Sequence, residues 1–187
     1  MPDKYRSFAA LAKSEVEGKD YRIGMRKRPG AIVVVAIHGG GIEAGTSEVA
    51  DGIAGDDLSV YTFEGIKSRR NRDLHITSHR FDEPRCTKLV TEAPVVISIH
   101  GEDSERQVVF LGGRDRAMRD ALRESLTTRG FMVETHKQKN LQGLDPRNIC
   151  NRATNGCGVQ LELSFGLRSL FLQIAVQNWT TYQEETI

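Results

Sequence analysis

Two histidines of the 187-residue chain each stand directly after an apolar run and directly before a glycine. The first is His38, in "AIVVVAIHGGGIE", and the second is His100, in "PVVISIHGED". Imidazole nitrogens are common zinc ligands, and two histidines with one carboxylate form a recurring catalytic set that leaves one coordination position open. Glu43, which ends the glycine stretch, can supply that carboxylate. We therefore predict a site for one zinc ion at His38, Glu43 and His100.

The three glycines at 39–41 admit two other interpretations. They can form a tight turn after a strand, with His38 and Glu43 as ordinary polar loop residues. They can also form a cradle of backbone N–H groups for a phosphate. Against the cradle, the GK[ST] and GxGxxG signatures of nucleotide-binding loops are absent. In a metal site, the glycines would let Glu43 fold back beside His38 and would leave room for a substrate.

A third candidate, Glu162, lies in the apolar stretch "GVQLELS", between Leu161 and Leu163. Strand alternation gives it a face shared with Gln160 and Ser164. The carboxylate is therefore either solvated on an open sheet face or placed in a cleft. In a cleft beside a metal ion, a glutamate can act as general base and then as general acid. We predict that catalytic role for Glu162.

Strands that alternate with helices must bring these side chains together. Continuous β-branched runs such as 31–37 and 94–100 are typical of strands buried on both faces. In α/β sheets, sites form outside the carboxyl ends of the strands, which is where these candidates would lie. We predict a single catalytic domain over 1–187, an α/β fold with an open, mixed, mostly parallel sheet and helices on both faces. The predicted strands cover 31–37, 58–63, 74–77, 94–100, 107–111, 131–135 and 158–164. The predicted helices cover 4–14, 46–54, 86–92, 114–129 and 168–187.

Composition excludes several classes of protein. A net charge of +1 and 6% aromatic residues indicate neither a polycation nor a base-stacking surface, so we expect no nucleic-acid partner. No apolar run reaches the about 18 residues of a membrane span, and the N-terminal residues lack the apolar core of a signal peptide. We expect no membrane partner, a monomer, and synthesis in the cytoplasm with cell lysis as a route of release. The three cysteines form no CxxC pair and are expected to be free thiols.

Five segments in order along the chain carry a family resemblance. They are "HGGGIE", "LHITS", "FDEP", "SIHGED" and "NICNRATNGCGVQLELS", and together they resemble the poly-γ-glutamate hydrolases of Bacillus and its phages. The resemblance implies a carboxypeptidase-like core, zinc on His38, Glu43 and His100, and Glu162 as general base and acid. It implies γ-linked polyglutamate as the substrate. Two alternatives stay open: a zinc amidohydrolase or carboxypeptidase-like enzyme acting on small acidic amides, and a non-catalytic polyanion-binding module.

The same resemblance suggests substrate-binding residues. Asn151 and Arg152 match the adjacent Asn-Arg pair with which zinc carboxypeptidases grip a substrate carboxylate, and a guanidinium suits that group geometrically. The family pattern reads Ser-Thr-His before "FDEP", whereas here the histidine, His79, comes one place earlier. That shift leaves the role of His79 open, and Arg80 is a candidate anchor in its place. His75 has no motif support for a metal role, and we expect a structural histidine there.

A second histidine, His136, is expected to be structural for the same reason. Arg114 could reach the site, whereas the charged residues that follow it are expected to form a solvated helix face.

Overall fold

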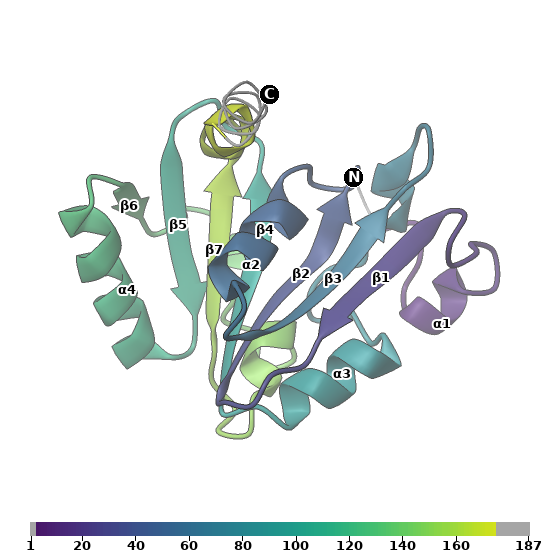
Figure 1. Cartoon of the computed structure of the whole chain (residues 1–187), viewed down its shortest axis with the longest axis horizontal. Helices are drawn as coiled ribbons and strands as arrows, with labels where there is room; N and C mark the ends of the chain where they lie inside the picture. The colour runs from purple at the N-terminus through teal and green to yellow at the C-terminus, as the bar shows by residue number, and fades with distance from the viewer. Residues whose placement is uncertain (1–2, 175–187) are drawn as a thin grey trace, which may run out of the picture.

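One mixed sheet of seven strands runs through the molecule (Figure 1). The computed structural model of the protein describes residues 3–174. The strand order is β1-β3-β2-β4-β7-β5-β6. The strands are β1 (Tyr21–Arg26), β2 (Ile32–Gly40), β3 (Ser59–Gly65), β4 (Val95–Glu102), β5 (Val108–Gly113), β6 (Met132–Glu134) and β7 (Val159–Ser164).

Four neighbouring strands at the centre are parallel, and antiparallel strands flank them. The parallel block is β3-β2-β4-β7. The strand β1 pairs antiparallel with β3, β5 pairs antiparallel with β7, and β6 pairs parallel with β5. This arrangement confirms the predicted α/β fold with a mixed, mostly parallel sheet. It also brings the carboxyl ends of β2, β4 and β7 to the same edge.

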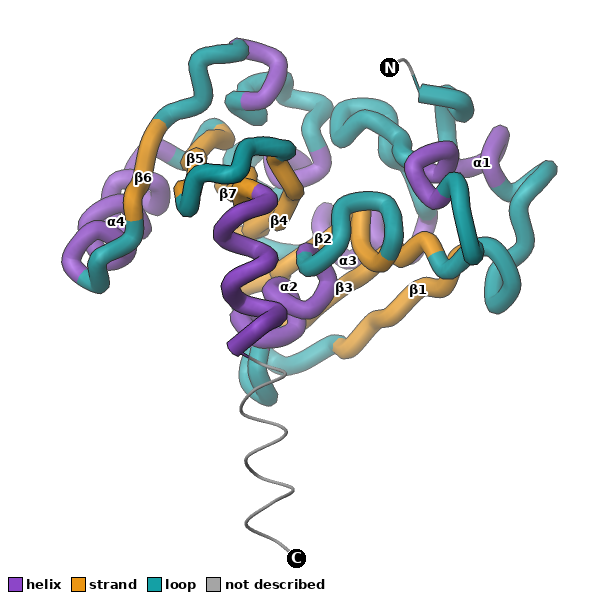
Figure 2. The backbone as a smooth tube through the Cα atoms, turned by 90° about the horizontal axis from the view of Figure 1, so that it is seen from above, coloured by secondary structure: helices purple, strands orange, loops and turns teal. Residues whose placement is uncertain are grey.

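Helices cover both faces because each buried strand is apolar on both sides. The α-helices are α1 (Phe8–Leu11), α2 (Thr46–Ala54), α3 (Pro84–Thr91), α4 (Arg116–Thr128) and a helix over 165–174. In β2, Val33 and Val35 face a core shared with α1 and α3, whereas Val34 and Ala36 face a core shared with α2 and helix 165–174. Figure 2 shows that last helix lying beside α2. The two cores hold the sheet rigidly beneath the site.

Several element boundaries differ from the sequence prediction. Residues 74–77 are not a strand: a 3-10 helix, η1 (Asn71–Leu74), leads into a turn there, although Leu74 and Ile76 are fully buried. The apolar alternation therefore reflects burial without strand pairing. The predicted helix over 4–14 is reduced to α1. Of the predicted helix over 168–187, only the part up to 174 falls within the described residues.

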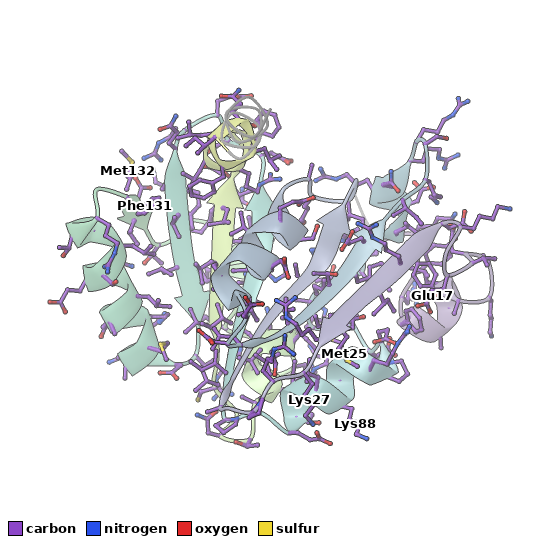
Figure 3. The ribbon with its side chains drawn as sticks, in the orientation of Figure 1. Glu17, Met25, Lys27, Lys88, Phe131 and Met132 are labelled. Atoms are coloured by element: carbon purple, nitrogen blue, oxygen red, sulfur yellow. The ribbon has the colours of Figure 1, made fainter. Side chains whose placement is uncertain are left out.

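The two edge strands carry exposed methionines. Met25 of β1 and Met132 of β6 are 52% and 51% exposed and lie at opposite sides of the sheet (Figure 3). Strand β1 was not predicted, because "YRIGMR" is interrupted by charge and glycine. Polar and short strands of this kind are typical of sheet edges. Neither edge contributes a residue to the site described next.

Candidate metal centre

A bulge in β2 turns His38 toward the other candidate residues. The pairing of β2 with β3 shifts register between Ala36 and Gly39. Strict alternation would have placed His38 on the face of Val34 and Ala36. The extra residue instead directs it to the opposite face, where its Nε2–H donates to the carbonyl of Ile76 at 2.9 Å. That hydrogen bond leaves the Nδ1 lone pair of a neutral His38 for the site.

His100, in β4, lies beside His38, in the neighbouring strand β2. The two Nδ1 atoms face one another at 3.2 Å, and the two rings lie at 63°. The Nε2 of His100 is 3.4 Å from the Oγ of Ser78. Burial, followed by the nearby His38, lowers the pKa of His100 to about 3, so its ring is neutral at ordinary pH. Two imidazole nitrogens that converge in this way have the geometry of ligands to a shared cation.

Glu43 completes the group from the loop that follows β2. Its backbone N–H donates to the His38 carbonyl at 2.8 Å, which is the tight turn expected from the glycines. Its Oε2 accepts from the Gly101 N–H at 2.7 Å, and its Oε1 lies 3.2 Å from Nδ1 of His38. Burial would raise the pKa of Glu43, but the neighbouring histidines and the Gly101 N–H outweigh it and lower that pKa to about 2. One carboxylate oxygen is thus anchored and the other faces the histidines.

The glycine stretch serves the packing of this loop rather than access for a substrate. A Cβ on Gly40 would lie 2.5 Å from the carbonyl oxygen of Gly65, and Gly40 has a φ of +59°. A Cβ on Gly41 would lie 2.4 Å from the side-chain nitrogen of Asn71. The space expected to be left for a substrate is filled by the end of β3 and by Asn71. The glycines are needed because the loop lies directly against that strand.

His75 belongs to the same cluster, contrary to the structural role expected from the sequence. Its ring stacks on His38 with centroids 4.0 Å apart and an interplanar angle of 29°. Suitable ligand atoms of His38, Glu43 and His75 all lie within 4.8 Å of one another. The Nδ1 of His75 is 2.7 Å from a carboxylate oxygen of Asp3, and its Nε2 is 3.8 Å from Glu43.

His75 and His100 are therefore the two candidates for the third ligand beside His38 and Glu43. A cation lies best in the plane of each ring that binds it. Because His75 is stacked nearly parallel to His38, a cation in the plane of His38 falls outside the plane of His75. His100 forms a T-shaped pair with His38, with the two Nδ1 atoms 3.2 Å apart, and is not stacked on it. The ring planes therefore distinguish His100, as the candidate for a third donor, from His75, which lies stacked beside it.

Burial alone would lower the pKa of His38, but the charge of Glu43 outweighs that effect and raises the pKa. The proton that His38 holds at this raised pKa lies where a cation would bind. Binding of a metal ion at this centre must therefore release that proton.

Glu162 lies next to His100 on the neighbouring strand. The two residues are register partners, and Phe110 of β5 pairs with Glu162 on its other side. Gln160 donates to Oε1 of Glu162 at 2.7 Å. Burial, reinforced by the charges of Glu43 and Glu102, raises the pKa of Glu162 well above its ordinary value. A carboxyl in this environment binds a proton readily, as a catalytic base requires.

All four predicted residues, His38, Glu43, His100 and Glu162, line one cleft of about 660 Å³. The described part of the chain also places charged side chains of both signs and histidines around it: the cations Arg72 and Lys139, the histidines His75, His79 and His136, and the carboxylates Glu102, Asp103 and Asp145. Arg72 and Lys139 were not predicted from the sequence, because they lie in segments whose course depends on the folded structure. The cleft therefore surrounds the four predicted residues with side chains of both charges.

The proposed substrate-binding residues do not line this cleft. Asn151 donates to the carbonyls of Gly143 and Asp145 at 2.7 and 2.9 Å, and its oxygen accepts from backbone N–H groups. Its amide thereby holds the loop that borders the cleft, and its contact with a substrate carboxylate stays a prediction. Arg152 is half-buried and donates to the Arg147 carbonyl at 2.9 Å. Arg80 is exposed outside the lining.

The fold and the site define an α/β protein with a histidine-carboxylate centre at the carboxyl edge of its parallel strands. A family model described as poly-gamma-glutamate hydrolase matches residues 5–187. The UPF0714 protein YndL of Bacillus subtilis (strain 168) is 40% identical over 185 residues, which span 98% of this chain and 73% of YndL. The chain belongs to the poly-gamma-glutamate hydrolase family.

Two solved structures agree with that assignment. The structure of a bacteriophage poly-gamma-glutamate hydrolase matches with a TM-score of 0.85 and 31% identity, covering 89% of this chain and 81% of that one. A zinc-free apo structure of YndL matches with a TM-score of 0.85 and 40% identity, covering 90% and 83%. Within residues 3–174, no helix is long and apolar enough to cross a membrane.

Proposed function

We propose that this protein hydrolyses γ-glutamyl amide bonds of poly-γ-glutamate, with one zinc ion held by His38, Glu43 and His100. The observation that carries the proposal is the convergence of two Nδ1 atoms at 3.2 Å beside Oε1 of Glu43. Two imidazole nitrogens and one carboxylate oxygen match a catalytic zinc set, and these residues would hold the ion at the cleft. The zinc-free description of the YndL structure supports the choice of metal.

Residues of the chain transfer the proton and orient the proposed ligands. Zinc, when bound, polarises the amide carbonyl and makes a water molecule more acidic. Glu162 accepts the proton of the attacking water at the carboxylate oxygen that Gln160 leaves free, and delivers it to the departing amine. The Ile76 carbonyl and the Gly101 N–H hold His38 and Glu43 in orientation. Hydrolysis then needs no covalent intermediate with the protein.

Positive side chains around the cleft would bind the carboxylates of the substrate. Arg72 and Lys139 border it, whereas the net charge of the chain is only +1. The attraction is therefore local, and high salt should weaken binding of the polymer. Arg80 and Arg152 remain predicted anchors that would act beyond the cleft itself.

The proposal is tested by zinc content and polymer length together. Wild type, His38→Ala and Glu162→Gln are assayed for bound zinc and for depolymerisation of poly-γ-glutamate on a gel. We expect one zinc per chain in wild type and in Glu162→Gln, loss of zinc in His38→Ala, and loss of activity in both variants. Retention of one zinc by His38→Ala, or wild-type digestion by Glu162→Gln, would contradict the assignment.

The product pattern separates the alternatives. An endohydrolase shortens long chains quickly, whereas an enzyme for small acidic amides releases monomers first or leaves the polymer intact. A polyanion-binding module would bind the polymer without lowering its viscosity.

A further inference from the structure

A buried arginine, Arg168, links the three segments that carry the candidate centre. It lies in helix 165–174 and is 3% exposed. Its Nε donates to the carbonyl of Leu163 at 3.0 Å and its Nη2 to the carbonyl of Glu102 at 3.1 Å. Its Nη1 donates to the carbonyl of Ala44. One guanidinium thus joins the ends of β4 and β7 to the loop after β2.

Each of these carbonyls is close in sequence to a residue of the site. Ala44 directly follows Glu43, Leu163 directly follows Glu162, and Glu102 is two residues beyond His100. Fixing the three carbonyls relative to one another therefore fixes the spacing of the three side chains.

The contact between Arg168 and Glu43 is mediated by Gly101. A Cβ added to Gly101 would lie 2.7 Å from Cζ of Arg168 and 2.9 Å from Cβ of Glu43. The Gly101 N–H also donates to Oε2 of Glu43 at 2.7 Å. The guanidinium therefore packs directly behind the strand that anchors the Glu43 carboxylate. Gly101 therefore lies between Arg168 and Glu43 and is in close contact with both.

The hydrogen-bonding pattern suits arginine and no other residue. Within the described residues, Arg168 forms no salt bridge, and its side-chain hydrogen bonds go to backbone carbonyls. Burial lowers the pKa of Arg168, and the nearby charges of Glu43 and Asp103 oppose that effect only in part, so the buried guanidinium needs several well-placed acceptors. The planar guanidinium presents donors in a rigid fork, whereas lysine is a point charge on a flexible stem.

We infer that Arg168 is a positioning residue that sets the distances among Glu43, His100 and Glu162. It acts through the backbone and touches neither substrate nor metal. The inference rests on the metal site of the proposed function but not on its substrate. Nothing in "SFGLRS" marks the arginine at the level of sequence, because its partners are carbonyls from three distant segments.

The test compares Arg168→Lys and Arg168→Met with Arg123→Met. Arg123 is a matched control, since it also donates to a backbone carbonyl, that of Val133 at 3.0 Å, but it joins α4 to the strand β6. Zinc affinity is measured by competition with a chelator, at a temperature where all variants are folded by circular dichroism. Both Arg168 variants should bind zinc about 10- to 100-fold more weakly, the usual effect of losing a residue that supports metal ligands. Arg123→Met should bind zinc as wild type does.

A second measurement, on metal-free protein, tests the positioning role of Arg168 independently of zinc binding. Hydrogen exchange of the Gly101 amide, followed by NMR in metal-free protein, should be at least tenfold faster in Arg168→Met than in Arg123→Met. Unchanged zinc affinity together with unchanged Gly101 exchange in the folded Arg168 variants would overturn the positioning role. If wild type itself binds no zinc, the proposed function fails, and the Gly101 exchange alone decides the role of Arg168. Failure of both Arg168 variants to fold, while Arg123→Met folds, would also overturn it, because the residue would then be a general stabiliser.

Discussion

Ring orientation distinguishes the single histidines of the proposed metal site from one another. The Nε2–H of His38 is fixed by the Ile76 carbonyl, and the Nδ1 atom therefore faces His100. The Nδ1 of His75 is fixed by Asp3, which leaves Nε2 toward the cleft, but the ring is stacked on His38. Side chains of one type, a few ångströms apart, thus receive different roles from their hydrogen-bond partners.

The first prediction separates His100 from His75. His100→Ala should weaken zinc binding at least about 100-fold, because it removes a ligand. His75→Ala should weaken it about tenfold or less, because it removes only a supporting contact. Chelator competition on the two purified variants gives the comparison. A larger loss in His75→Ala than in His100→Ala would reverse the assignment of the third ligand.

The second prediction concerns Glu15, which is 8% exposed and remote from the centre. Burial would raise its pKa, but hydrogen bonds from Tyr5, Lys67 and Lys4 outweigh that effect and lower the pKa below its ordinary 4.5. A lowered folded-state pKa contributes stability that is complete above the unfolded pKa and is lost as pH falls through the folded one.

Glu15→Gln should therefore lower the free energy of unfolding at pH 7 by about 1–3 kcal/mol, as for loss of hydrogen bonds to a charged group. The difference from wild type should shrink as pH falls below about 4.5. Urea unfolding at pH 7 and at pH 3.5 measures both values. A difference that is equal at the two pH values would contradict the ionic role of Glu15.

At the scale of elements, strand ends and close backbone contacts hold the centre together. The parallel strands β2, β4 and β7 deliver His38, His100 and Glu162 to one edge, as their apolar runs predicted. The bulge in β2 was not predictable, because a run of apolar residues carries no alternation in which an extra residue would show. His75 was missed because it stands in a turn whose position is fixed by Asp3, a residue distant in sequence.

The third prediction tests the close contact at Gly101. Gly101→Ala should weaken zinc binding about tenfold or more, because the added methyl group would meet Arg168 and Glu43 at less than 3 Å. Gly52→Ala is the matched control: Gly52 lies within α2, and an added Cβ meets nothing within 4 Å. That control should be about 0.5–1 kcal/mol more stable than wild type, from helix propensity, with unchanged zinc affinity. Equal zinc affinity in the two variants would show that the Gly101 contact is unimportant.

At the scale of the whole molecule, the two cores on either side of the sheet decide which groups solvent reaches. Cys86 and Cys150 are fully buried in the core shared with α1 and α3, whereas Cys157 is partly exposed. Burial raises the pKa of Cys150 to about 12. All three are free thiols, as the sequence predicted.

The fourth prediction follows from that distribution. At pH 8, native protein should react rapidly with a disulfide reagent such as DTNB at one thiol, because only Cys157 is reached by solvent and thiolate is the reacting form. Unfolding in 6 M guanidinium should bring the number of reacting thiols to three. The substitution Cys157→Ala should abolish the rapid reaction of the native protein. Two rapid equivalents in native wild type would mean that this core opens readily.

The order of the strands has a consequence for how the protein is made. Strand β7 lies between β4 and β5 in the sheet but follows both in the chain. During synthesis, His38, Glu43 and His100 leave the ribosome well before Glu162 and Arg168, and the edge of β4 stays unpaired until β7 arrives. Such late, long-range pairing slows folding and leaves a strand edge open to wrong partners. The nascent chain therefore acquires the proposed zinc ligands first and the proposed catalytic carboxylate last.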